Sequence, residues 1–311
     1  MSVQATDLVT GAFGYTGSRI AERLLARGRA VRTLTRRTAV DHPLATRVER
    51  FPSAFDDANL DGALAGVDTL YVTYWMRFPR GGATWDELVA NVARLAGAAR
   101  RQGIRRLVYI SVSNARPDST TAYFRAKAAA EGRIRAAGTG AMSVAIVRPT
   151  LLYGPSDILI NNMAWSLRRL PVFGIPGDGR YRVQPVHVDD VADLCIRLGS
   201  GDDHVETDAA GPETLTFDEL VRLVKTAVRS RALLAHMPVA VVLATTRLMG
   251  LLVRDVVLTR DEIRELAESL LTSSANPAGT TSTRFSEWLA ANAADVGRCY
   301  SSELGRNFRL R

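Results

Sequence analysis

Cysteine is scarce in this chain, which has 2 cysteines, Cys195 and Cys299, among 311 residues. Two cysteines so far apart in sequence fit neither a disulfide framework nor a zinc-binding knuckle. The sequence also lacks a P-loop, a Ser-His-Asp constellation and any internal repeat. We therefore expect an ordinary folded domain without a metal site.

Lysine is almost absent, because Lys127 and Lys225 are the only lysines and arginine supplies the other basic residues. The formal net charge of +8 raises the question of nucleic-acid binding. The arginines, however, are spread along the whole chain with carboxylates between them, and no basic tail or basic run with interleaved aromatics occurs. Solvated surfaces explain this pattern, so we expect no nucleic-acid partner.

Long apolar runs are missing too. The first residues show no basic region followed by an apolar stretch, and the apolar segment from Met237 to Met249 is interrupted by Arg247 and too short to span a bilayer. We expect a cytoplasmic protein without an integral membrane span, acting as a monomer or homodimer on a small-molecule substrate. A helix near Pro238 to Val253 would cover the core, or alternatively pack against a membrane or a second subunit.

Three glycines spaced three apart form the most informative motif. An apolar run ends at Val9, and a segment with helical periodicity begins after the glycines. A strand, a glycine turn and a helix N-terminus together bind the pyrophosphate of a dinucleotide; the alternative is an ordinary glycine-rich turn. The cofactor contacts expected here are Gly11, Ala12, Phe13, Gly14, Tyr15, Thr16 and Gly17.

Two arginines, Arg36 and Arg37, end the second predicted strand. An acidic residue at this position accepts a hydrogen bond from the ribose 2′-hydroxyl of NAD, whereas an arginine pairs with the 2′-phosphate of NADP. No carboxylate ends this strand. We therefore favour NADP(H) over NAD(H), with Arg36 as the better candidate; two surface arginines in an arginine-rich chain are the alternative.

An aromatic segment follows the fourth predicted strand, which spans Val67 to Thr73. It lies past the carboxyl end of a strand, where parallel sheets place their ligands. Thr73 is an expected cofactor contact, and the aromatic side chains would line a substrate pocket or pack beneath a loop. The substrate contacts proposed on this basis are Tyr74, Trp75 and Phe78, with Trp165 and Arg168 from later in the chain.

Tyr123 and Lys127 lie four residues apart in a predicted helix and share one face of it. A nearby ammonium lowers the pKa of a phenol and makes it a better acid or base. Ser113, at the end of the preceding strand, would hold a substrate carbonyl beside the tyrosine. The alternative is a chance pair, which is less expected where lysine is so rare.

Beyond the sixth predicted strand the alternation of strands and helices ends. Pro149 and Thr150 follow that strand and are expected near the cofactor, and His187 beside a capping aspartate is expected to be structural. From Thr216 onward the pattern predicts mainly helices. We expect a Rossmann domain over 1–157, to which 182–205 return, and a smaller substrate domain from 158–181 and 206–311.

Together these residues resemble the short-chain dehydrogenase/reductase superfamily in its extended or atypical branch, in the group with complex I 39-kDa-subunit-like, NmrA-like and NAD-dependent epimerase/dehydratase proteins. The resemblance rests on the glycines, Asn91, the Tyr123–Lys127 pair, Arg148-Pro149-Thr150, and Gln184 to Ala192. It implies an α/β, doubly wound, parallel-sheet Rossmann fold with a small, mainly helical C-terminal domain. It also implies that Tyr123 is the acid or base, that Lys127 binds the nicotinamide ribose and that Ser113, or less favourably Ser111, polarises the substrate.

The leading functional hypothesis is therefore an NADP-dependent oxidoreductase that transfers hydride between NADPH and a carbonyl or alcohol. A non-catalytic NADP(H)-binding redox sensor or scaffold is one alternative, and a nucleotide-sugar epimerase or dehydratase is another. The interval from Ser113 to Tyr123 is short for a nucleotide-sugar epimerase, which argues against the last.

Overall fold

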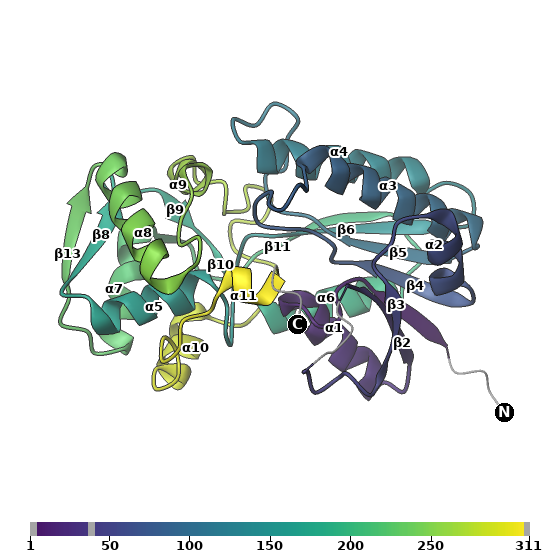
Figure 1. Cartoon of the computed structure of the whole chain (residues 1–311), viewed down its shortest axis with the longest axis horizontal. Coiled ribbons are helices and arrows are strands. Elements are labelled where there is room, and N and C mark those ends of the chain that lie inside the picture. Colours follow the sequence, from purple (N-terminus) through teal and green to yellow (C-terminus); the bar gives the residue numbers. More distant parts are fainter. Residues whose placement is uncertain (1–4, 37–40, 308–311) are drawn as a thin grey trace. The chain divides into compact units, whose positions relative to one another are not determined.

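The computed structural model describes residues 5–36 and 41–307. Its described residues form two compact units. Of the described residues, the first unit comprises 5–36, 41–149 and 191–207, and the second comprises 150–190 and 208–307. Each unit is described by itself below (Figure 1).

A seven-stranded sheet has the order β11-β6-β5-β4-β1-β2-β3. Strands β1 to β6 pair in parallel, and the chain order reverses between β1 and β4. Parallel sheets bind their ligands at such a switch point, beyond the carboxyl ends of the strands. The strands are β1 (Thr6–Val9), β2 (Ala30–Thr35), β3 (Val48–Pro52), β4 (Val67–Val72), β5 (Arg106–Ile110), β6 (Ser143–Pro149) and β11 (Val205–Ala209).

Helices cover both faces of this sheet. One face carries α2 (Asp57–Leu64), α3 (Trp85–Arg101) and α4 (Ala122–Ala137), and the other carries α1 (Tyr15–Ala26) and α6 (Val188–Gly199) (Figure 1). The side chains of Asp56 and Thr84 cap α2 and α3 by accepting hydrogen bonds from the third helical N–H. Apolar side chains of α2, α3 and α4 pack on the strands in one buried cluster. The doubly wound α/β fold expected from the sequence is confirmed.

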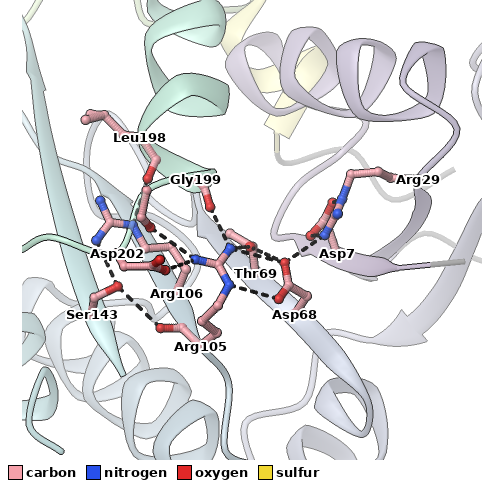
Figure 2. A network of polar contacts seen from close by, with 11 residues as sticks. Asp7, Arg29, Asp68, Thr69, Arg105, Arg106, Ser143, Leu198, Gly199 and Asp202 are labelled. Carbon is pink, nitrogen blue, oxygen red and sulfur yellow. Dashed lines mark hydrogen bonds and ion pairs between the residues drawn. The ribbon is translucent and has the colours of Figure 1, made fainter. Parts of the chain in front are cut away.

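Arginine ion pairs close the amino end of the sheet (Figure 2). Arg29 bonds to both Asp7 and Asp68, and Arg105 bonds to Asp68 from the other side. Arg106 is completely buried and donates to the carbonyls of Leu198 and Asp203. Burial alone would raise the pKa of the Asp68 carboxyl, but its hydrogen bonds from Arg105, Thr69 and Arg29 lower the pKa overall. The amino edge of the sheet is thus a structural region, which leaves the carboxyl edge for ligands.

The second unit has a separate core. Apolar side chains of α5, α7 and α10 pack together around Tyr153 and Phe285. Its elements are β7 (Leu151–Tyr153), α5 (Leu159–Arg169), β8 (Val172–Pro176), β9 (Arg182–Val183), β10 (Pro185–His187), β12 (Leu215–Thr216), α7 (Phe217–Ala227), β13 (Leu233–Met237), α8 (Val239–Val253), α9 (Arg260–Ala267), α10 (Phe285–Asn292) and α11 (Glu303–Asn307).

Several strands of this unit were not predicted from the sequence, among them β8 and β13. The segment Leu233–Met237 is β13, which pairs in parallel with β8. A short apolar run does not distinguish a strand from a buried helix segment, and its distant partner decides the outcome. No helix in the described ranges has the length and apolarity that crossing a membrane requires.

Candidate active site

The glycine turn between β1 and α1 is built so that its backbone comes close together. Gly11 has φ +71°, in the left-handed region that favours glycine. A Cβ at Gly17 would lie 2.2 Å from the carbonyl oxygen of Gly11, and a Cβ at Gly14 would lie 3.1 Å from the same atom. A side chain at Gly17 would therefore displace the loop. This tight cradle fits a dinucleotide pyrophosphate.

Three threonines from neighbouring strands hold this turn. The Thr10 hydroxyl oxygen accepts from the N–H groups of Thr73 and Tyr74, at 2.8 and 2.9 Å. The Thr33 hydroxyl donates to the Val9 carbonyl at 2.8 Å and accepts from the Ala12 N–H at 3.1 Å. Thr73 in turn donates to the Thr10 carbonyl. The turn is thus fixed to β2 and to the end of β4 before any ligand binds.

The N-terminus of α1 follows this turn directly. Gly14 is its N-cap, no side chain caps the helix in the described structure, and its first turn holds no acidic residue. Such a terminus offers N–H donors and a partial positive charge to an anion. Phe13 packs its ring against His42, and Tyr15 and Thr16, the first residues of α1, are half-buried.

Arg36 follows the last residue of β2 and is exposed. Its positive charge acts on Tyr74, where it opposes the rise in pKa that burial causes. Arg36 therefore lies at the carboxyl edge of the sheet, at the position the sequence predicted. Arg37 lies outside the described residues.

Lys127 projects from α4 to the carboxyl end of β5. Its Nζ donates to the carbonyl of Ile110 at 2.9 Å and lies 4.3 and 5.1 Å from the ring centroids of Trp75 and Tyr109. The residue is 3 % exposed. Burial lowers the pKa of Lys127 to about 7, although the Glu131 carboxylate opposes this change. The Lys127 side chain therefore changes between ammonium and neutral amine close to neutral pH.

Tyr123 lies one helical turn before Lys127, among aromatic side chains. Its ring contacts Trp85 edge-on at 5.6 Å between centroids, Phe124 at 5.4 Å and Trp75 at 6.4 Å. Trp75 and Trp85 stack on each other at 6.0 Å. The structure thus brings the tyrosine, the lysine and the predicted substrate residue Trp75 into one aromatic enclosure.

Two serines follow β5 towards the same edge. The Ser113 N–H donates to the Pro149 carbonyl at 2.9 Å, which ties the end of β5 to the end of β6. Ser113 is completely buried. Ser111 is also buried, and its hydroxyl has no hydrogen-bond partner in the described part of the chain.

The remaining residues of the aromatic segment pack outside this enclosure. Tyr74 packs against Phe55 at 4.8 Å and accepts a hydrogen bond from Asn91 at 3.1 Å. Phe78 carries the guanidinium of Arg77 over its ring at 5.7 Å. Asn91, which the sequence singled out, thus fixes the start of this segment to α3.

Three predicted site residues belong to the second unit. The Trp165 ring packs against Tyr300, and Arg168 donates to the carbonyls of Ala293 and Val296. Thr150 donates to the Gln184 carbonyl. Within this unit, the observed contacts of Arg168 and Thr150 are with backbone groups.

Sequence reasoning missed four residues of the site. Trp85 and Tyr109 complete the aromatic enclosure, Thr33 holds the glycine turn, and Glu131 acts on Lys127 from one turn along α4. Only Glu131 had a signal in the sequence, its i+4 spacing from Lys127. The other three come from distant positions that only folding brings to the site.

Comparisons with known proteins find several relatives of this chain. The chain is 33% identical over 173 residues to the sterol demethylase protein B of Methylococcus capsulatus, covering 49% of this chain and 53% of that protein. It is 29% identical over 187 residues to the ceramide reductase of Caulobacter vibrioides, covering 59% and 57%. The matched region thus spans little more than half the length of these relatives.

Solved structures share the fold across almost the whole chain. The triphenylmethane reductase of a Citrobacter species, complexed with NADP(H), superposes with a TM-score of 0.70 at 18% identity and covers 93% of this chain and 98% of its own. UDP-sugar epimerases share the same fold. The model of the NAD dependent epimerase/dehydratase family matches residues 8–207 of this chain. Members of that family bind NAD(P). This chain belongs to the NAD dependent epimerase/dehydratase family.

Proposed function

We propose that this protein is an NADP-dependent oxidoreductase that transfers hydride between NADPH and a carbonyl or alcohol carbon of an apolar substrate. The observation that carries the proposal is the placement of Tyr123 one turn from the buried ammonium of Lys127, inside an aromatic enclosure. A phenol beside a lysine in an apolar setting is suited to proton exchange with a substrate oxygen.

The glycine turn and the N-terminus of α1 would hold the pyrophosphate, and Thr73 would lie alongside the cofactor. Arg36 would pair with the 2′-phosphate, which supports NADPH over NADH. When bound, the dinucleotide supplies or accepts the hydride.

Tyr123 would supply the matching proton. In the direction of reduction, its Oη–H donates a proton to the substrate oxygen while hydride reaches the carbon, so the carbonyl becomes an alcohol. Positive charge on Lys127 favours the phenolate that remains. Ser113 would donate a hydrogen bond to the same substrate oxygen and orient it.

An apolar substrate is supported by what surrounds Tyr123. The Tyr123 ring is surrounded by the apolar rings of Trp75, Trp85 and Phe124, which meet it edge-on. The names of the relatives point the same way, since one is a ceramide reductase and another a sterol demethylase protein. We propose a lipid-like ketone or alcohol as the substrate class.

A second candidate is an epimerase or dehydratase acting on a nucleotide sugar. It is favoured by the family match and by the UDP-sugar epimerases among the structures that share the fold. Such an enzyme returns the hydride to its substrate and shows no net consumption of NADPH.

The two candidates are separated by one assay. Purified protein is mixed with NADPH or NADH and with a panel that contains a long-chain keto lipid, a short ketone and UDP-glucose, and absorbance at the nicotinamide band is followed. We expect NADPH oxidation with the keto lipid. Tyr123→Phe should reduce turnover by ~10²–10⁴ while cofactor affinity stays within about twofold.

Tyr181→Phe is the matched control, because Tyr181 belongs to the second unit and its hydroxyl donates to the Pro176 carbonyl. Turnover unchanged in Tyr123→Phe would contradict the proposed acid. Conversion of the UDP-sugar without NADPH oxidation would establish the second candidate. Tight NADPH binding without turnover of any compound would favour a sensor or scaffold instead.

A further inference from the structure

Helix α8 of the second unit exposes apolar side chains along one face. Leu248, Leu251 and Leu252 are 64%, 77% and 80% exposed, and Val241 lies on the same exposed face. Positions 241, 244, 245, 248, 251 and 252 follow the three- and four-residue spacing of a helical stripe. The opposite face is apolar as well, and there Val242 and Leu243 pack with Ile263. Helix α8 is therefore apolar on the side that covers the unit and on the side that faces outward.

This stripe contains no polar group that requires water. Thr245 lies within it, but its hydroxyl donates to the carbonyl of Val241 at 3.1 Å, within the helix itself. Leu233, on β13, is a further exposed apolar side chain at 70%, and its cross-strand partner Val172 on β8 is also exposed. Because helix α8 packs on β8, these strands extend the apolar surface of this unit. Monomeric proteins rarely expose so many large aliphatic side chains together.

The charged residues of α8 and of the chain segment before it are basic. No aspartate or glutamate occurs between Glu219 and Asp255 in the sequence, whereas the same interval contains Arg222, Lys225, Arg229, Arg231, Arg247 and Arg254. Arg247 lies on α8, and Arg254 is its C-cap; both are exposed. Exposed leucines flanked by arginines on one helix are typical of helices that lie in the interface of an anionic membrane.

We propose that α8 docks this protein onto the surface of an anionic lipid bilayer. Its leucines would enter the boundary between head groups and acyl chains, and Arg247 and Arg254 would reach the lipid phosphates. With 15 residues, α8 is too short to span the bilayer, so it lies in the plane of the interface.

A second copy of the chain is a poorer occupant. In a two-fold dimer the same patch would face itself, and the arginines around it would meet arginines. Like charges across an interface disfavour association. An anionic surface matches both the apolar stripe and its surrounding charge.

The test is cosedimentation of the purified full chain with vesicles, without cofactor or substrate. One set of vesicles is phosphatidylcholine and the other contains phosphatidylglycerol as well. The wild type should bind the anionic vesicles and lose binding as salt is raised. Leu248→Ser/Leu251→Ser/Leu252→Ser should weaken binding by roughly 30-fold or more, because the buried apolar area is lost.

Two further variants control this result. Replacing the same three leucines by methionine keeps the surface apolar and should preserve binding. Arg247→Gln/Arg254→Gln should weaken binding to anionic vesicles by about fivefold per arginine. The control, Arg100→Gln/Arg133→Gln, removes the same charge from exposed positions of the first unit and should change vesicle binding little. Thermal unfolding confirms that each variant is folded, and the arginine pair tests the proposal even if the serine variant is not.

Absence of vesicle binding by the wild type, or equal binding by the serine variant, would overturn the proposal. A wild-type dimer in light scattering that the serine substitutions convert to a monomer, with no binding to vesicles, would overturn it in favour of a second copy. Because none of these measurements involves NADPH, their outcome does not depend on whether the proposed oxidoreductase activity is correct.

Discussion

The ammonium of Lys127 lies 4.3 Å from the centroid of the Trp75 ring. Trp75 comes from the segment after β4 and Lys127 from α4, so the contact joins two separate parts of the first unit. A cation over an indole face is attracted by about 2 kcal/mol where water is excluded. Together with the Ile110 carbonyl, the ring holds the ammonium in place.

Gly17→Ala should disrupt cofactor binding. The added Cβ would meet the Gly11 carbonyl oxygen at 2.2 Å, and this backbone atom can move only if the whole turn shifts. We expect NADPH affinity to fall by about tenfold or more and stability by roughly 1–3 kcal/mol. Calorimetric titration and thermal unfolding measure both. Gly62→Ala is the control, because no atom lies within 4 Å of the Cβ it adds in α2; unchanged binding by Gly17→Ala would refute the cradle.

Arg36→Ala should weaken NADPH binding towards the value for NADH. A charge-assisted hydrogen bond to the 2′-phosphate contributes roughly 1.5–3 kcal/mol, or about 10- to 100-fold in affinity. NADH, which lacks that phosphate, should bind both forms equally. Titration of each nucleotide into each protein measures this difference, with Arg100→Ala as a charge control. A parallel loss for NADH would mean that Arg36 acts on the fold rather than on the phosphate.

The catalytic efficiency of the wild type should decline above about pH 7. Burial lowers the pKa of Lys127 to about 7, so the ammonium is present below this pH and lost above it. If its charge supports Tyr123, kcat/KM falls by up to about tenfold per pH unit on the alkaline side. Lys127→Met should be slow at every pH and lack this decline. The control, Lys225→Met, replaces the other lysine and should keep the wild-type dependence of kcat/KM on pH. A wild-type kcat/KM that stays constant up to pH 9 would argue against the role of Lys127.

Trp75→Leu should move that alkaline decline to higher pH. Removing the indole takes away a cation–π contact that favours the charged form, but burial is the largest influence on the pKa of Lys127. The gain of hydration therefore outweighs that loss, and the pKa of Lys127 rises towards its ordinary value. The kcat/KM profile of the variant should retain activity at a pH where the wild type has lost it. Phe55→Leu is a suitable control, because this ring packs on Tyr74 rather than on the lysine. An unshifted profile would show that Trp75 does not shield Lys127.

Asp157→Asn should change how stability depends on pH. Burial raises the pKa of Asp157 to about 7, one carboxyl oxygen accepts from the Ile160 N–H, and the other has no partner in the described structure. The folded state therefore binds a proton that the unfolded state releases between about pH 4 and pH 7, and this group reduces stability as pH rises through that range. Asparagine keeps the accepting oxygen without the charge. In chemical denaturation, the free energy of unfolding of the variant should rise relative to that of the wild type from pH 4 to pH 7. A difference between the two free energies that stays constant over this range would contradict the prediction.

Much of the first unit followed from local pattern. Strands β1, β3, β4 and β5 are each followed by a helix, and this alternation predicts a doubly wound sheet. The glycines of the turn were recognisable because φ +71° at Gly11 favours glycine and the close approach at Gly17 leaves no room for a Cβ. The second unit was less predictable, because β13 forms only through its pairing with β8.

The sequence by itself determined the fold class, the glycine turn and the pairing of Tyr123 with Lys127, because each depends on spacing along one element or across one turn. Tertiary structure decided what surrounds them. Trp75, Trp85 and Tyr109 reach Lys127 and Tyr123 from three other segments, and burial rather than residue type lowers the pKa of the lysine. Likewise, the apolar face of α8 is visible as composition, but only packing shows which leucines remain outside. Contacts between distant segments and exclusion of water arise from folding as a whole, so no local pattern encodes them.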